Sequence, residues 1–133
     1  MAGNVKPNTN QTKGISASNK LLPTRNSILG NNPQINNQTG TSYSFVLADM
    51  GNMVVSNNAS SVTFTVPPNS SVNYPVGAQI DVLQLGVGQV TISPGSGVTI
   101  NATPGTKIAA RYSAATLIQT SANNWTLVGS LAA

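Results

Sequence analysis

Residues 61–66 read Ser-Val-Thr-Phe-Thr-Val, and residues 67–70 continue with Pro-Pro-Asn-Ser. Val62, Phe64 and Val66 fall on one side of an extended chain, because successive side chains of a β-strand point to opposite faces. The two prolines then end the strand, since proline lacks the N–H group that a sheet ladder needs. The stretch therefore predicts a half-buried β-strand with a defined end.

Short β-rich runs of the same kind recur on both sides of this strand. They lie at 43–47, 53–55, 79–85, 90–92, 98–100, 107–112, 115–119 and 125–128. Clusters of Gly, Pro, Asn or Ser separate them, for example 94–97 and 104–105, and no helical stretch of useful length appears. This spacing predicts an all-β domain over residues 41–133, a small antiparallel β-sandwich or a barrel-like domain.

Residues 1–40 have a different texture, with many Asn, several Pro and Gly, and apolar residues only as isolated spots. Neither a helical nor a strand period persists through them. Alone, such a segment buries too little apolar area to offset the entropy lost on ordering. We expect an extended, irregular, polar and basic N-terminal arm that orders on a partner; a disordered tail is the alternative.

Charge is divided unequally between the two regions. The net charge of the chain is +4, and Lys6, Lys13, Lys20 and Arg25 precede residue 41. The remaining two basic and two acidic residues cancel. Four dispersed charges without an aromatic residue for base stacking make nucleic acid a poor partner, so an acidic protein surface is favoured. The candidate contact residues are Lys6, Lys13, Lys20, Leu21, Leu22, Arg25, Ile28 and Leu29.

The composition argues against catalysis. The chain has no Cys and no His, which excludes disulfides, Cys/His zinc sites and a Ser-His-Asp triad. Of its two carboxylates, Asp49 is expected in a turn or as a cap, and Asp81 on a strand surface or paired with Arg111 or Lys107. We therefore expect no enzyme, no catalytic, cofactor-binding or metal-binding residue and no cofactor. No apolar run is long enough for a membrane span, so no membrane contact is expected.

Three aromatic residues, Tyr74, Tyr112 and Trp125, are candidates for a sugar-binding face. The competing interpretation, which we favour, places them in the core or at a sheet edge.

Several runs together resemble a small β module that recurs in phage virion proteins. They are SFVLAD (44–49), SVTFTVPPNS (61–70), PVGAQI (75–80), GQVTI (88–92), GVTIN (97–101), YSAATLI (112–118) and WTLVG (125–129). The module is found at the ends of tail fibres, in minor tail proteins and in head-attached decoration proteins. The resemblance covers residues 43–131 and not the arm. It implies a virion role, often with threefold assembly, and no catalytic residues.

The short chain without a fibre shaft favours a capsid cement or decoration protein of the head-fibre kind, located on the head surface of the virion. Its arm would anchor it to the major capsid protein or another virion protein, and the β domain would form a homotrimer. The alternative is a tail fibre or tail-tip component whose β domain contacts host surface glycan. A glycan is therefore expected as a partner only if the chain acts as a component of a phage tail.

Overall fold

The computed structural model describes residues 32–133, of which Gln34–Ala133 form one compact unit. Its elements are β1 (Ile35–Gln38), β2 (Ser42–Ser44), the 3-10 helix η2 (Leu47–Asp49), β3 (Met53–Ser56), β4 (Val62–Val66), β5 (Gln79–Gln84), β6 (Val90–Pro94), β7 (Thr99–Asn101), β8 (Lys107–Ile108), β9 (Ala114–Ser121), β10 (Asn124–Gly129) and β11 (Leu131–Ala132).

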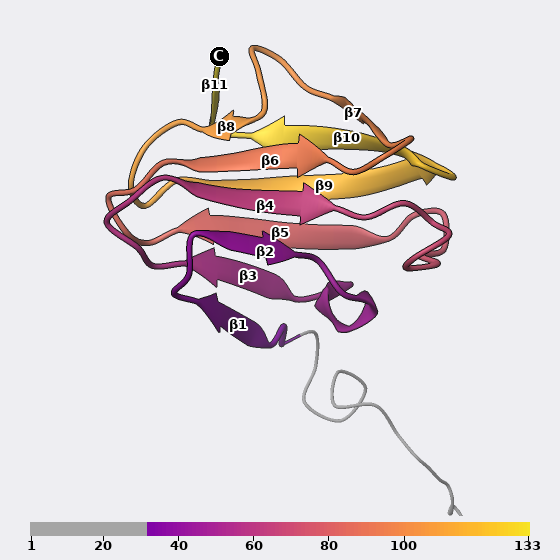
Figure 1. Ribbon diagram of the computed structural model, residues 1–133, viewed down its shortest axis with the longest axis horizontal. Coiled ribbons are helices and arrows are strands. Elements are labelled where there is room, and N and C mark those ends of the chain that lie inside the picture. The colour runs from indigo at the N-terminus through magenta and orange to yellow at the C-terminus, as the bar shows by residue number, and fades with distance from the viewer. Residues whose placement is uncertain (1–31) are drawn as a thin grey trace, which may run out of the picture. The chain divides into compact units, whose positions relative to one another are not determined.

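The strands form two sheets that face each other (Figure 1). One sheet has the order β1-β3-β5-β9-β10-β7, and the other has the order β11-β8-β6-β4-β2. Inward-facing positions are apolar and outward-facing positions are polar, as in β4, where Val62, Phe64 and Val66 are buried and Thr63 is exposed. The prediction of an all-β, two-layer domain is confirmed.

The pairing is not antiparallel throughout. The first six strands alternate between the two sheets. Within each sheet, consecutive strands pair in parallel: β1 with β3 and β3 with β5 in one sheet, and β2 with β4 and β4 with β6 in the other. They form three stacked coils, which we number in chain order as β1–β2, β3–β4 and β5–β6. Antiparallel pairing holds for β9 with β5 and β10, and for β8 with β6 and β11.

The parallel stacking depends on the loops that carry the chain from one sheet to the other. Gly86 and Gly88, after β5, lie against the backbone of Asn58 and Ser60, after β3. A Cβ atom on Gly88 would stand 1.8 Å from the Ser60 carbonyl oxygen. Short Gly- and Asn-rich loops of this kind suit a hairpin equally well, and the sequence analysis predicted antiparallel pairing. The contact between the two loops favours stacked coils over antiparallel pairs. It joins residues that are far apart in the sequence, so no local pattern predicts it.

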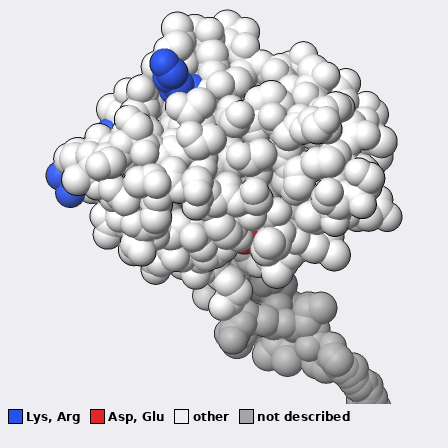
Figure 2. Space-filling view, in the orientation of Figure 1, with Lys and Arg blue, Asp and Glu red and all other residues white. Residues whose placement is uncertain are grey.

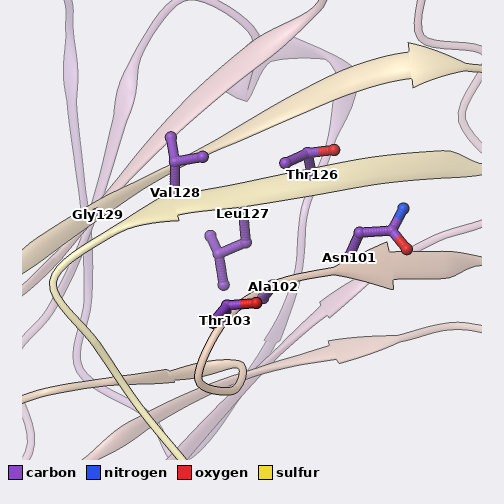
Figure 3. A pocket seen from close by; sticks show the side chains of 7 residues that line it. All are labelled: Asn101, Ala102, Thr103, Thr126, Leu127, Val128 and Gly129. Carbon is purple, nitrogen blue, oxygen red and sulfur yellow. The ribbon is translucent and has the colours of Figure 1, made fainter.

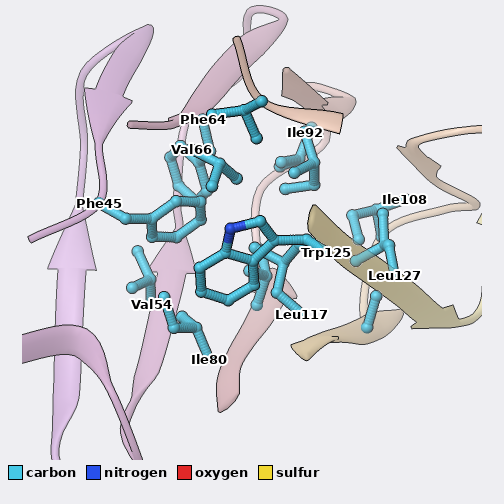
Figure 4. Packing of buried hydrophobic residues seen from close by; sticks show 14 of the residues in the cluster. Phe45, Val54, Phe64, Val66, Ile80, Ile92, Ile108, Leu117, Trp125 and Leu127 are labelled. Atoms are coloured by element: carbon cyan, nitrogen blue, oxygen red, sulfur yellow. The ribbon is translucent and has the colours of Figure 1, made fainter. Parts of the chain in front are cut away.

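Buried aromatic and aliphatic side chains from both sheets fill the space between them (Figure 4). Trp125 of β10 is fully buried, and its ring meets Tyr74 edge to face at 5.3 Å. Phe45 and Phe64 pack edge to face at 5.6 Å, and Tyr43 contacts both rings. This core confirms one of the two interpretations of Tyr74 and Trp125: both are core residues, and neither can belong to an exposed sugar-binding face.

The strands predicted over 53–55, 61–66, 79–85, 90–92, 115–119 and 125–128 correspond closely to β3, β4, β5, β6, β9 and β10. Two runs are shorter than expected: 43–47 gives β2 and then η2, and 107–112 gives only β8. β1 lies within the stretch that the sequence assigned to the arm. Its inward side chains, Asn36 and Gln38, are polar, so no apolar alternation marks it.

Candidate interaction surface

The predicted contact residues of the arm, Lys6 through Leu29, lie outside the residues that the structure describes. The surface that can be built from described residues is therefore the first coil, through which the chain enters the β domain. β1 and β2 form this coil, and each is the edge strand of its own sheet.

Among the described residues, no strand pairs with the outer edge of β1. The Met53 N–H donates to Gln34 O at 3.0 Å, and the Asn57 N–H donates to Gln38 O at 2.9 Å. Alternate residues of a strand direct their backbone groups to opposite sides, so Gln34, Asn36 and Gln38 bond to β3. Ile35 and Asn37 consequently direct their N–H and C=O groups away from the domain.

The edge of β2 repeats this arrangement in the second sheet. The Thr63 N–H donates to Thr41 O at 3.0 Å, and the Phe45 N–H donates to Thr65 O at 3.1 Å. By the same alternation, Ser42 and Ser44 direct their backbone groups outward. Within residues 32–133, the first coil therefore has two open sheet edges, and open edges are the surfaces to which an extended peptide adds a strand.

A polar cluster closes the interior of the first coil. The buried carboxylate of Asp49 accepts hydrogen bonds from the Tyr43 hydroxyl at 2.7 Å, from Asn36 Nδ2 at 2.9 Å and from the Val46 N–H at 2.9 Å. Burial, with a smaller contribution from Asp49, raises the pKa of Tyr43 to about 12. Asn36 and Tyr43 of the cluster occupy the positions that Val54 and Phe64 occupy in the second coil, so the cluster ends the apolar core with satisfied polar groups.

Exposed apolar side chains accompany these edges. Ile35 begins β1, and Val46, Leu47 and Met50 lie in and around η2. The η2 segment is tied to the start of β1, because Asn52 accepts from the Gln34 N–H and donates to Ala48 O. We call the open edges of β1 and β2 together with these four side chains the N-terminal face. In the part of the chain that the structure describes, it combines outward-directed backbone groups with exposed apolar side chains, which suits contact with another protein.

A hollow lies beyond the end of β7, where β10 continues past its pairing with β7 (Figure 3). It has a volume of about 360 Å³ and is lined by Asn101, Ala102, Thr103 and the β10 residues Thr126–Gly129. Its lining contains no titratable side chain, so it offers no acid, base or charge partner to a ligand.

The two carboxylates stay apart, as the sequence suggested. Asp49 caps η2 within the polar cluster, and Asp81 on β5 accepts a hydrogen bond from the Thr116 hydroxyl at 2.7 Å. They share no hydrogen-bond partner. Within residues 32–133, no cluster of His, Cys, Asp and Glu is suited to holding a metal ion. The described part also contains no helix long and apolar enough to span a membrane.

The sequence did not single out the first coil as a surface. Asn36 and Tyr43 come from different sheets, and only the fold brings them to Asp49. The one signal that pointed to this cluster was the expectation that Asp49 serves as a turn or cap residue. In comparisons with known proteins, no protein-family model, curated protein or solved structure matched this chain.

Proposed function

We propose that this chain is a structural protein of a phage particle, a capsid cement or decoration protein that anchors to capsid subunits through its N-terminal segment. The observation that carries the proposal is the separation of charge and fold along the chain. The four basic residues that account for the net charge of +4 all precede Gln34, where the compact unit begins. A segment with this basic composition is suited to binding acidic grooves on neighbouring subunits.

The N-terminal face supports the same reading. The chain enters the domain at β1, beside two open sheet edges and exposed apolar residues. A capsid surface that supplies an extended strand would satisfy the backbone groups of Ile35 and Asn37 and cover Ile35 and Leu47. The segment and the N-terminal face would then bind as two linked sites, and assembly of the domain as a homotrimer would multiply both.

The proposal also draws on the resemblance of residues 43–131 to the phage virion module, and it assigns the chain a binding role without catalysis. The competing role at the tail, with a glycan as ligand, has less support, because two of the three aromatic residues that would form a sugar-binding face are buried. Tyr112 alone is exposed.

The test is the location and number of copies of this chain in the particle. Heads and tails are separated from purified particles, and the chain is quantified in each against the major capsid protein by mass spectrometry with labelled peptides. We expect it with the heads, in a fixed ratio to capsid subunits. Recovery with tails alone, in a handful of copies, would overturn the proposal in favour of the tail role.

A further inference from the structure

One residue of the domain adopts a backbone conformation that its side chain does not favour. Six described residues have φ in the left-handed region: four are the glycines Gly51, Gly77, Gly97 and Gly129, and one is Asn123. Glycine and asparagine adopt this region at low cost. The sixth is Tyr112, with φ of 67°. A large aromatic side chain is unusual there and costs conformational energy that other interactions must offset.

Packing inside the domain does not explain this tyrosine. Its side chain is 66% exposed, in contrast to Tyr74 and Trp125, which fill the core. The turn itself is held by backbone groups, because the Tyr112 N–H donates to Gln84 O at 2.7 Å and the Ser113 N–H donates to Ala110 O at 3.1 Å. A glycine at position 112 would keep both bonds without strain. The aromatic ring is therefore what the strained position presents to solvent.

Arg111 lies against this ring and is held in place. Its guanidinium carbon is 4.7 Å from the centroid of the Tyr112 ring, within the range of a cation–π contact. Its Nε donates to Leu85 O at 3.0 Å. With Nε occupied, the two terminal nitrogens remain to form a forked pair of hydrogen bonds with one carboxylate.

The charge of this end of the domain matches such a ligand. Lys107 and Arg111 are the two basic residues of the described part, and Figure 2 shows the blue side chains towards one end of the domain. Asp49 is buried, and Asp81 bonds to Thr116 on another part of the sheet. Among the described residues, the Arg111 guanidinium contacts the Tyr112 ring and Leu85 O, and neither contact neutralises its charge, so the charge is available to a partner.

We propose that Arg111 and Tyr112 form a contact site for a protein partner that presents a carboxylate side chain next to apolar surface. Arginine and tyrosine are among the side chains enriched at the centres of protein interfaces, and here the two contact each other. This inference is independent of the proposed anchoring through the N-terminal segment. Loss of head binding would leave it standing, and its own failure would leave the anchoring proposal standing.

The experiment is an NMR titration of the full-length chain, labelled with ¹⁵N, with a capped tetraglutamate peptide and, in parallel, a capped tetraglutamine peptide. A site-resolved readout is needed because the basic N-terminal segment also attracts the acidic peptide. We expect tetraglutamate to shift the Arg111 Nε–H and the Tyr112 and Ser113 amide signals, and tetraglutamine to leave them in place. Arg111→Gln should weaken the response at the amides about tenfold or more, whereas Lys107→Gln, the matched charge control, should retain it.

Tyr112→Gly separates a binding role from a structural one. It removes the ring at a position that glycine adopts freely, so the urea midpoint should stay the same or rise while the response to tetraglutamate is lost. The proposal is overturned if tetraglutamine shifts the same signals, or if Arg111→Gln leaves the response intact. It is equally overturned, in favour of an acidic glycan, if a tetragalacturonate saccharide shifts these signals and tetraglutamate does not.

Discussion

At the scale of single residues, the polar cluster of the first coil shows how one buried carboxylate closes the end of an apolar core. Asp49 is 3% exposed and accepts three hydrogen bonds from residues of β1, β2 and the approach to η2. Every donor is neutral, so the negative charge is stabilised by hydrogen bonds rather than by a cation. Such a group is intolerant of change because each of its partners would be left unsatisfied.

Asp49→Asn should therefore destabilise the domain. The new amide directs an NH₂ group at one of the former donors, and we expect a loss of about 1–3 kcal/mol in the free energy of unfolding, measured by urea denaturation. Asp81→Asn is the matched control, since an amide oxygen still accepts from Thr116, and it should change stability by less than about 0.5 kcal/mol. Equal effects of the two substitutions would contradict this role of Asp49.

The pKa of Tyr43 predicts instability in alkali. Burial raises it to about 12, and burial followed by the charge of Asp49 raises the pKa of Tyr74 as well. An unfolded tyrosine titrates near pH ~10. Above that pH the unfolded chain binds fewer protons than the folded one, so stability is complete below pH ~10 and falls as the pH rises towards about 12. Urea midpoints across this range should show the fall, with a shallower slope in Tyr43→Phe; midpoints independent of pH would refute it.

At the scale of elements, the stacked loops between strands hold the coils in register. Gly88 lies so close to Ser60 that Gly88→Ala would place a Cβ atom 1.8 Å from a carbonyl oxygen and 2.4 Å from its carbon. Because both are backbone atoms, the loops must separate, and we expect thermal and urea unfolding to show a loss of about 3 kcal/mol. Gly40→Ala, where the nearest atom is 3.9 Å away, should be nearly neutral. Tolerance of Gly88→Ala would show that the loops do not stack.

The open edge of β1 makes a different prediction for two neighbouring residues. Proline removes a backbone N–H, and that of Asn37 points outward whereas that of Asn36 bonds to β3. Asn37→Pro should leave stability within about 1 kcal/mol of the parent, and Asn36→Pro should cost about 3 kcal/mol. Under the proposed function, Asn37→Pro should also weaken binding to heads by blocking strand addition. A large loss of stability in Asn37→Pro would show that the β1 edge is not open.

Strands with a buried apolar face were predictable because alternation of side chains is a local signal, as in 61–66 and 79–85. β1 was not, since Asn36 and Gln38 face a polar cluster rather than the core. The parallel stacking was not predictable either, because it depends on the contact of Gly86 and Gly88 with a loop about thirty residues earlier. The strained turn at Tyr112 contains no Gly or Asn, the residues that usually indicate a left-handed conformation, so the sequence did not predict it.

At the scale of the whole molecule, the four basic residues that give the chain its net charge of +4 precede the β domain, whose own charged side chains cancel. The bounds of β1 determine how many N-terminal residues can be removed without damage to the domain. Removing residues 1–40 would delete β1 together with Asn36, which donates a hydrogen bond to Asp49, and would damage the domain. Removing residues 1–31 leaves the compact unit Gln34–Ala133 whole. The second truncation therefore tests binding without confounding it with folding.

The most direct measurement is co-sedimentation with purified phage heads that lack this protein, using the full-length chain, the chain without residues 1–31, and the full-length chain with Lys6, Lys13, Lys20 and Arg25 replaced by Gln. The account predicts that the full-length chain binds and raises the heat resistance of the heads. The truncated chain should keep its unfolding temperature but bind far more weakly, and the neutralised chain should bind weakly and with less dependence on salt. Undiminished binding by a folded chain without residues 1–31 would contradict the account.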